Sequence, residues 1–305
     1  MAENPKKMLI LAILEILRQT TDEEHRLLQA DIMERLTQDY GLTATRKSVR
    51  RNLADLQEAG YPVYYQGGWY YEHEFTNAEL NLLLDGLECN GSVTAAQRDA
   101  LAGKLCALGG KWYAPSIGGQ QLKPANPQFL YVLDTLHEAI RMGCQVTFRY
   151  TDYDVDKQLH PRLDEQGLPK EYLVNPYRLA SANGRYYLIC NVDKYSSLAH
   201  FRVDRIVDIR LKKRAVKALQ RVRGAEKGID LPEYLAGHPY MYAGEVETIR
   251  IAADRCAIND ILDWFGMDTI LTPMGEERVL AEVRTDRSSM NYWLQRYGEH
   301  AELSE

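Results

Sequence analysis

The dipeptide Asn183-Gly184 constrains the fold of this chain more than any other feature. Asn-Gly is the strongest short signal for a β-hairpin, because both residues readily adopt the positive φ angles of a type I′ turn. It is flanked by two β-prone runs, residues 172–182 and 185–191. These two runs are therefore predicted to pair as antiparallel strands.

Further short strands are predicted around that hairpin, over residues 145–151, 198–203 and 206–211. They follow an amphipathic helix predicted over residues 129–142, which Gly143 closes. About five short strands at regular spacing are typical of a small β-barrel. We therefore expect a barrel domain in the middle of the chain.

The first 75 residues are predicted to form three amphipathic helices and a second hairpin. The apolar residues of these helices recur at helical spacing. They are Ile10, Ile13, Leu14 and Leu17, then Leu28, Ile32 and Leu36, and then Val49, Leu53 and Leu56. Either Thr43 or Thr45 can cap the third helix. Residues 61–71 form an aromatic-rich hairpin around Gly67-Gly68.

The third helix is basic on the side opposite its apolar stripe. Residues 41–54 hold four cations and no acid. Three helices and a hairpin are the order of a winged helix-turn-helix, which places a helix in the DNA major groove. The residues expected to contact double-stranded operator DNA are Thr45, Arg46, Lys47, Ser48, Arg50 and Arg51. The alternative is a solvated basic face on a protein-binding three-helix unit.

The remaining segments complete an α+β multidomain chain. Thr76 and Glu79 form a capping box for helices that extend to about residue 108, and residues 109–127 have the composition of a loop. Residues 248–303 follow the order β-α-β-β-α-β of a ferredoxin-like unit. We predict four domains: 1–75 for DNA binding, 76–126 as a helical connector, 127–215 as the barrel and 216–305 as a C-terminal extension.

Composition argues against several classes of protein. The net charge of −6 does not indicate a nucleic-acid binder overall, although a local basic face suffices for phosphate contact. The five cysteines are scattered without a CxxC pair, and no HExxH motif or catalytic constellation is present. No apolar run is long enough to span a membrane. We expect a cytoplasmic protein that is no enzyme and has no cofactor, metal site or membrane partner.

The barrel sequence resembles the WYL-domain transcriptional regulators. The resemblance lies in Asn175-Pro176-Tyr177-Arg178-Leu179, in residues 183–189, and in Phe201-Arg202-Val203-Asp204-Arg205-Ile206. The family's Trp-Tyr-Leu triplet is here Tyr186-Tyr187-Leu188. The resemblance extends to the winged helix and to the C-terminal extension, called WCX. It implies an Sm-like barrel, a nucleic-acid fragment or nucleotide as effector, and a homodimer assembled through the C-terminal extensions.

The effector-binding residues that this resemblance implies combine cations with aromatic rings, which bind phosphates and stack on bases. They are Tyr177, Arg178, Tyr186, Tyr187, His200, Arg202 and Arg205. Strand alternation puts Arg202 and Arg205 on opposite faces, so both can line one pocket only if the strand ends or bends near Asp204. Arg202 could instead pair with a surface acid. Tyr186 and Tyr187 also face oppositely, and which one faces the pocket stays open.

These patterns favour a DNA-binding transcriptional regulator whose barrel binds an effector that modulates operator binding. The alternative is a nucleic-acid-responsive adaptor that regulates a protein partner, such as the effector of a defence system, in place of a promoter.

Overall fold

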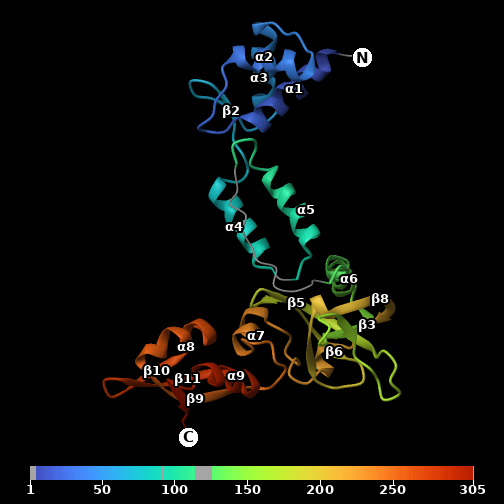
Figure 1. The fold of residues 1–305 in the computed structure, drawn as a ribbon, viewed down its shortest axis with the longest axis vertical. Coiled ribbons are helices and arrows are strands. Elements are labelled where there is room, and N and C mark those ends of the chain that lie inside the picture. The colour runs from blue at the N-terminus through green and yellow to red at the C-terminus, as the bar shows by residue number, and fades with distance from the viewer. Residues whose placement is uncertain (1–4, 91, 114–125, 305) are drawn as a thin grey trace. The chain divides into compact units, whose positions relative to one another are not determined.

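The computed structural model describes residues 5–90, 92–113 and 126–304, which form a mixed α/β, multidomain chain. Figure 1 shows its two compact units. The first holds the described residues up to Cys89 and those from Ala95 to Tyr113. The second holds the described residues from Asn126 onward, with Asn90 and residues 92–94. The finer four-domain division stays a prediction, and most of the loop expected at 109–127 lies outside the described residues.

The three expected N-terminal helices and the hairpin are present in the first unit. Helices α1 (Pro5–Thr20), α2 (Gln29–Tyr40) and α3 (Arg46–Glu58) precede strands β1 (Val63–Tyr65) and β2 (Trp69–Tyr71). Ile13, Leu36 and Leu53 are fully buried in their shared core. Leu28 departs from expectation because it is the N-cap residue of α2 and is 56% exposed. Its backbone N–H donates to the Asp31 carboxylate, so it precedes the helix and does not join the apolar face.

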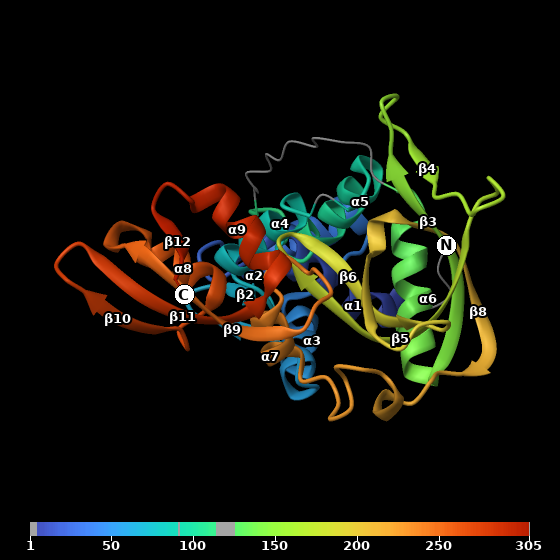
Figure 2. The ribbon, with the colours of Figure 1, turned by 90° about the horizontal axis from the view of Figure 1, so that it is seen from below.

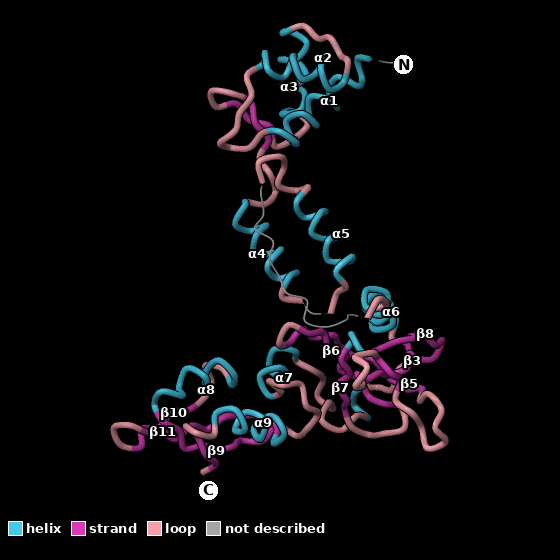
Figure 3. Tube along the Cα trace, viewed as in Figure 1, coloured by secondary structure: helices cyan, strands magenta, loops and turns pink. Residues whose placement is uncertain are grey.

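Two antiparallel helices, α4 (Asn77–Glu88) and α5 (Ala95–Cys106), complete the first unit (Figure 3). The predicted capping box is confirmed, because Thr76 and Glu79 each accept the other's backbone N–H. After α5 the chain returns to the end of α1. There the Trp112 indole N–H donates to the Thr20 carbonyl oxygen at 2.8 Å, and the Trp112 ring stacks on His25.

The second unit begins with helix α6 (Phe129–Met142) and a curled antiparallel sheet. Its strands are β3 (Cys144–Tyr153), β4 (Leu159–Pro161), β5 (Glu171–Ala182), β6 (Arg185–Val192), β7 (Leu198–Arg202) and β8 (Ile206–Ala215). The predicted hairpin is confirmed: Asn183 and Gly184 join β5 to β6 with φ angles of 51° and 67°. The sequence did not predict the short strand β4. Helix α6 packs against β3, β5 and β8 (Figure 2).

The strand order forces this sheet to curl. Strand β8 pairs with β3, and the pairing then runs through β5 and β6 to β7, so β7 and β8 lie at opposite edges. Only the 3-10 turn η1 (Val203–Arg205) separates them in sequence. Two opposite edges can be joined by three residues only if the sheet closes on itself. Aromatic rings fill the interior, where Phe201 of β7 contacts Phe148 and Tyr150 of β3.

A segment after β8 covers the outer face of β5 and β6. It contains turn η2 (Leu219–Arg221) and helix α7 (Leu231–Gly237), which the sequence did not predict. Val222, Ala225 and Met241 are buried there against Tyr177 and Ile189. The Asn183 side chain donates to the Pro239 carbonyl oxygen at 2.8 Å, which fixes the segment to the hairpin turn.

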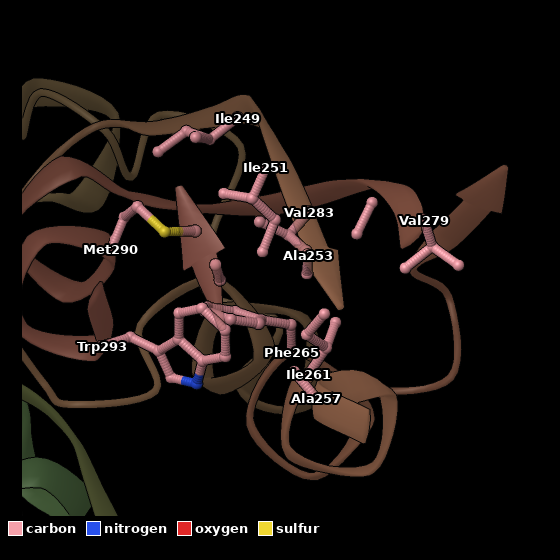
Figure 4. Close-up of a cluster of buried hydrophobic side chains, with 12 residues drawn as sticks. Ile249, Ile251, Ala253, Ala257, Ile261, Phe265, Val279, Val283, Met290 and Trp293 are labelled. Carbon is pink, nitrogen blue, oxygen red and sulfur yellow. The ribbon is translucent and has the colours of Figure 1, made fainter. Parts of the chain in front are cut away.

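The C-terminal part has the predicted element order. Strand β9 (Val246–Asp254) and turn η3 (Arg255–Ala257) precede α8 (Ile258–Phe265), β10 (Ile270–Met274), β11 (Arg278–Asp286), α9 (Arg287–Tyr297) and β12 (Ala301–Leu303). The antiparallel strands are ordered β10-β11-β9-β12. Figure 4 shows the core between helices and sheet, where Trp293 of α9 is fully buried against Phe265 of α8.

No helix among the described residues is long and apolar enough to cross a membrane.

We predict that Trp293→Ala lowers the free energy of unfolding by about 3–5 kcal/mol, because it empties the centre of this core. Urea denaturation followed by circular dichroism measures the loss. Met267→Ala is the matched control, since Met267 is 82% exposed, and it should change stability by less than about 0.5 kcal/mol. Equal effects of the two substitutions would contradict the assignment of Trp293 to the core.

Candidate nucleic-acid interface and effector site

Helix α3 presents its cations to solvent. Thr45 caps the helix by accepting the Ser48 backbone N–H at 3.2 Å, which decides between the two possible caps. Val49, Leu53 and Leu56 are buried, as predicted. Of the six residues proposed to contact DNA, Ser48 is half-buried, whereas Thr45, Arg46, Lys47, Arg50 and Arg51 are exposed.

These cations are available for phosphate contact. Arg51 has an acidic partner, Asp55, but the two groups lie 3.9 Å apart and the arginine side chain is 83% exposed. Such a solvated pair contributes little to stability, so a phosphate can replace the carboxylate at low cost.

A cation that sequence reasoning did not single out, Arg26 of the segment between α1 and α2, lies against the β1–β2 hairpin. Arg26 donates from Nη1 to the Gln66 carbonyl oxygen at 2.6 Å, and its guanidinium lies 5.4 Å from the centre of the Tyr70 ring. The backbone of the hairpin turn approaches Arg26 so closely that a Cβ added at Gly68 would lie only 2.8 Å from the Arg26 Cβ. Arg26 thereby adds positive charge at the turn of the hairpin.

In the barrel, strand β7 ends at Arg202 and the chain turns through Val203–Arg205. Arg202 and Arg205 could line one pocket only if the strand ended or bent near Asp204, and the strand does end there. Burial raises the pKa of Tyr153, and the guanidinium groups of Arg202 and Arg205 both oppose that shift, so both lie near one ring. Four arginines and two acids gather around this turn, and we call them the arginine cluster. Its members are Arg162, Arg185, Arg202, Arg205, Asp152 and Asp204.

Each acid of the arginine cluster holds two guanidinium groups. Arg202 donates to both oxygens of Asp204, at 3.0 and 2.6 Å, and Arg185 Nη1 lies 3.7 Å from the same carboxylate. Asp204 is only 6% exposed, so the surface acid considered as a partner for Arg202 is in fact a buried one.

Asp152 bridges the other two arginines. Arg162 Nε donates to it at 2.6 Å and Arg205 Nη1 at 2.9 Å. The hydrogen bond from Arg162 is the largest cause that lowers the pKa of Asp152. With four guanidinium groups and two carboxylates, the arginine cluster keeps an excess of positive charge.

Two donors in the arginine cluster lack a hydrogen-bond acceptor. Arg185 Nη1 and Arg205 Nε are both buried, and neither has a hydrogen-bond partner in the described part of the chain. A buried donor without an acceptor costs free energy. An acceptor that reached either donor would recover part of that cost.

Tyrosine side chains border the arginine cluster. Tyr187 lies directly across from Arg202 in the β6–β7 pair. Burial raises the pKa of Tyr187, and the guanidinium groups of Arg202 and Arg185 oppose that shift. Burial and, secondly, the carboxylate of Asp204 raise the pKa of Tyr153. Tyr186 lies elsewhere, with its ring 5.8 Å from that of Phe129 in α6. Of the two adjacent tyrosines, Tyr187 is therefore the one beside the arginine cluster.

Besides Tyr186, three more of the expected effector residues lie outside the arginine cluster. Arg178 is exposed on β5 and donates to the Tyr177 carbonyl oxygen. Tyr177 is buried, and its hydroxyl donates to the Lys217 carbonyl oxygen at 2.7 Å. Burial raises the pKa of Tyr177 to about 12.

The third, His200, is fixed in one neutral form by its partners. Its Nδ1 lies 2.9 Å from the Met241 carbonyl oxygen and must donate, so Nε2 accepts from the Tyr234 hydroxyl at 2.7 Å. Burial lowers the pKa of His200 to about 4. This histidine joins strand β7 to the covering segment.

Sequence reasoning missed Arg185, Arg162 and Tyr153. Arg185 could have been found, because residues 185 and 187 share one face of a strand and Tyr187 was already singled out. Arg162 and Tyr153 come from the β3–β4 hairpin, whose approach to residues 202–205 depends on closure of the barrel.

The comparisons place this barrel in a known domain family. The model of the WYL domain matches residues 131–211, and the chain therefore contains a WYL domain. Among solved structures the chain is similar to proteasome accessory factor B/C (PafBC) of Arthrobacter aurescens, with 19% sequence identity and a TM-score of 0.32. That match covers 98% of this chain and 46% of the other, so this chain spans about half its length. No curated protein matches.

We predict that His200 makes the second unit less stable in acid. The folded-state pKa of about 4 lies below the ordinary value of 6.5, so the unfolded chain binds more protons between these two values. Stability from this group is complete above pH 6.5 and falls as the pH drops towards 4, by about 3 kcal/mol in all. Urea titrations across this range measure the fall.

His200→Asn should flatten this pH dependence, whereas His137→Asn, at an exposed position on α6, should preserve it. A slope that is the same in wild type and His200→Asn would contradict the assignment.

Proposed function

We propose that the chain is a DNA-binding transcriptional regulator whose WYL domain binds a nucleic-acid fragment or nucleotide. The observation that carries the proposal is the arginine cluster, where two buried N–H donors lack acceptors beside aromatic rings. Guanidinium groups bind phosphates through paired hydrogen bonds, and tyrosine rings stack on bases. The proposed effector residues are Arg162, Arg185, Arg202, Arg205, Tyr153 and Tyr187.

The proposed DNA-binding element is a winged helix-turn-helix formed by α2, α3 and the β1–β2 hairpin. The exposed basic face of α3 supports it, since this is the helix that enters the major groove in such domains. Lys47, Arg50 and Arg51 are the proposed contacts on this helix, and Arg26 is a proposed phosphate contact of the hairpin.

In this proposal the barrel is an Sm-like WYL sensor and the C-terminal part a ferredoxin-like extension through which two chains form a cytoplasmic homodimer. A dimer suits the DNA function because two half-sites supply the base contacts that a single helix cannot. The effector acts by binding more tightly to one of two states of the chain, since equal affinity for both would shift nothing. We propose no catalytic step for the chain.

We predict that Lys47→Ala combined with Arg51→Ala weakens binding to mixed-sequence duplex DNA. The slope of log affinity against log salt concentration should flatten by about one unit for each lost phosphate contact. Fluorescence anisotropy over a salt series measures both quantities. Lys104→Ala, an exposed cation on α5 of the same unit, is the control. Affinity and slope equal to wild type in the double variant would remove α3 from the interface.

We predict that Arg185→Ala weakens binding of short 5′-phosphorylated single-stranded DNA about tenfold to a hundredfold, the usual effect of losing one charge-assisted hydrogen bond. Isothermal titration calorimetry measures the affinity. Arg202→Ala is a poorer test, because it would leave the buried Asp204 carboxylate without its bidentate partner. The paired change Arg202→Gln with Asp204→Asn removes both charges together, so no unpaired carboxylate is left buried.

Arg210→Ala, an exposed cation on β8, is the control and should bind like wild type. Unchanged affinity in Arg185→Ala and in the paired variant would place the effector elsewhere. If neither single-stranded DNA nor nucleotides bind the wild type, the effector class is wrong. Effector binding without any duplex binding would favour the adaptor that acts on a protein partner.

A further inference from the structure

Three residues with metal-binding side chains meet at one corner of the C-terminal sheet. Asp254 ends β9, Cys256 lies in the following turn η3, and His300 directly precedes β12. One ligand atom from each residue lies within 4.8 Å of the other two. Carboxylate, thiolate and imidazole are the three ligand types that zinc binds in proteins.

The backbone holds this corner in place. Strand β12 pairs with β9 so that Ala301 faces Ala253, and the Asp254 N–H donates to the His300 carbonyl oxygen at 2.8 Å. The two side chains are also in contact, since His300 Nδ1 lies 3.2 Å from Asp254 Oδ2. Two of the three ligands are therefore fixed by main-chain pairing before any ion binds.

We propose that Asp254, Cys256 and His300 bind one divalent, zinc-type ion through three protein ligands. Zinc–ligand distances of about 2.0–2.3 Å in a tetrahedron require ligand atoms roughly 3.3–3.8 Å apart. From the 4.8 Å limit the ligand atoms approach by at most about 1–1.5 Å, which rotation of the exposed Cys256 and His300 side chains supplies. Water fills the fourth position.

Local charge also bears on the site. Arg278 Nε lies 3.5 Å from Asp254 Oδ1 and opposes a bound cation. The same guanidinium donates from Nη2 to Glu302 at 2.9 Å. Without Arg278, the positive charge that repels a cation is gone and the carboxylates of Asp254 and Glu302 remain. Removal of Arg278 should therefore strengthen binding, an effect that a purely structural role for Asp254 and His300 would not produce.

Sequence spacing gave no warning of this site and led us to expect no metal. Cys256 and His300 are far apart in the chain and match no metal motif. Pairing of β9 with β12 brings them together.

The test is a titration of the full, reduced chain with Co²⁺, a spectroscopic substitute for zinc. We expect one equivalent to produce a near-ultraviolet thiolate-to-cobalt absorption band, which Zn²⁺ then removes by displacement. Cys256→Ser should abolish the band, and His300→Ala should weaken binding at least tenfold. Arg278→Gln should strengthen Co²⁺ binding. Cys89→Ser, at an exposed cysteine of the first unit, is the matched control and should retain the band.

Circular dichroism checks that every variant is folded, and mass spectrometry after alkylation gives a second readout. Bound Zn²⁺ should slow alkylation of Cys256 in the wild type and not in His300→Ala. The proposal fails if Co²⁺ gives no thiolate band, if Cys256→Ser retains the band, or if Zn²⁺ leaves alkylation of Cys256 unchanged.

Discussion

The short turn at Val203–Arg205 determines much of the second unit. It joins β7 to β8, the two edge strands of one sheet, within three residues. The sheet must therefore curl, and its interior fills with Phe148, Tyr150 and Phe201. Because Arg205 lies in this turn and not in a strand, its side chain is not forced onto the sheet face opposite Arg202. The buried carboxylate of Asp204 stabilises the turn because Arg202 binds it through two hydrogen bonds. Closure of the barrel and assembly of the arginine cluster thus have one local cause.

Much of this fold could be predicted from local sequence. Helical spacing gave α1, α3, α8 and α9, and Asn183-Gly184 gave the β5–β6 hairpin with its positive φ angles. Local signals act over a few residues, which is why they succeeded there. Leu28 failed because its apolar side chain fits the helical spacing while its backbone lies at the N-cap, where Asp31 accepts its N–H.

The candidate effector site was harder to predict, for a physical reason. Arg202, Arg205 and Tyr187 could be selected from one stretch of sequence, but Arg162 and Asp152 come from the β3–β4 hairpin. The sequence also could not separate a cation or ring that faces an effector from one that serves the fold. His200 and Tyr177 have suitable side chains, yet their partners are Met241, Tyr234 and Lys217 of the covering segment. That segment follows the barrel in sequence, and no local pattern relates it to either residue.

The internal pairing of the arginine cluster has a consequence for selectivity. Asp204 and Asp152 hold the guanidinium groups in defined positions, so a ligand loses little free energy in ordering those side chains. A ligand must nevertheless compete with the carboxylates, which already accept hydrogen bonds from Arg162, Arg202 and Arg205. An ion of low charge density, such as chloride, gains little from that exchange. A phosphate offers several oxygens at once and can accept from the donors that the carboxylates leave unused. The barrel would thus discriminate against the abundant monovalent anions around it while its arginines stay ready to bind.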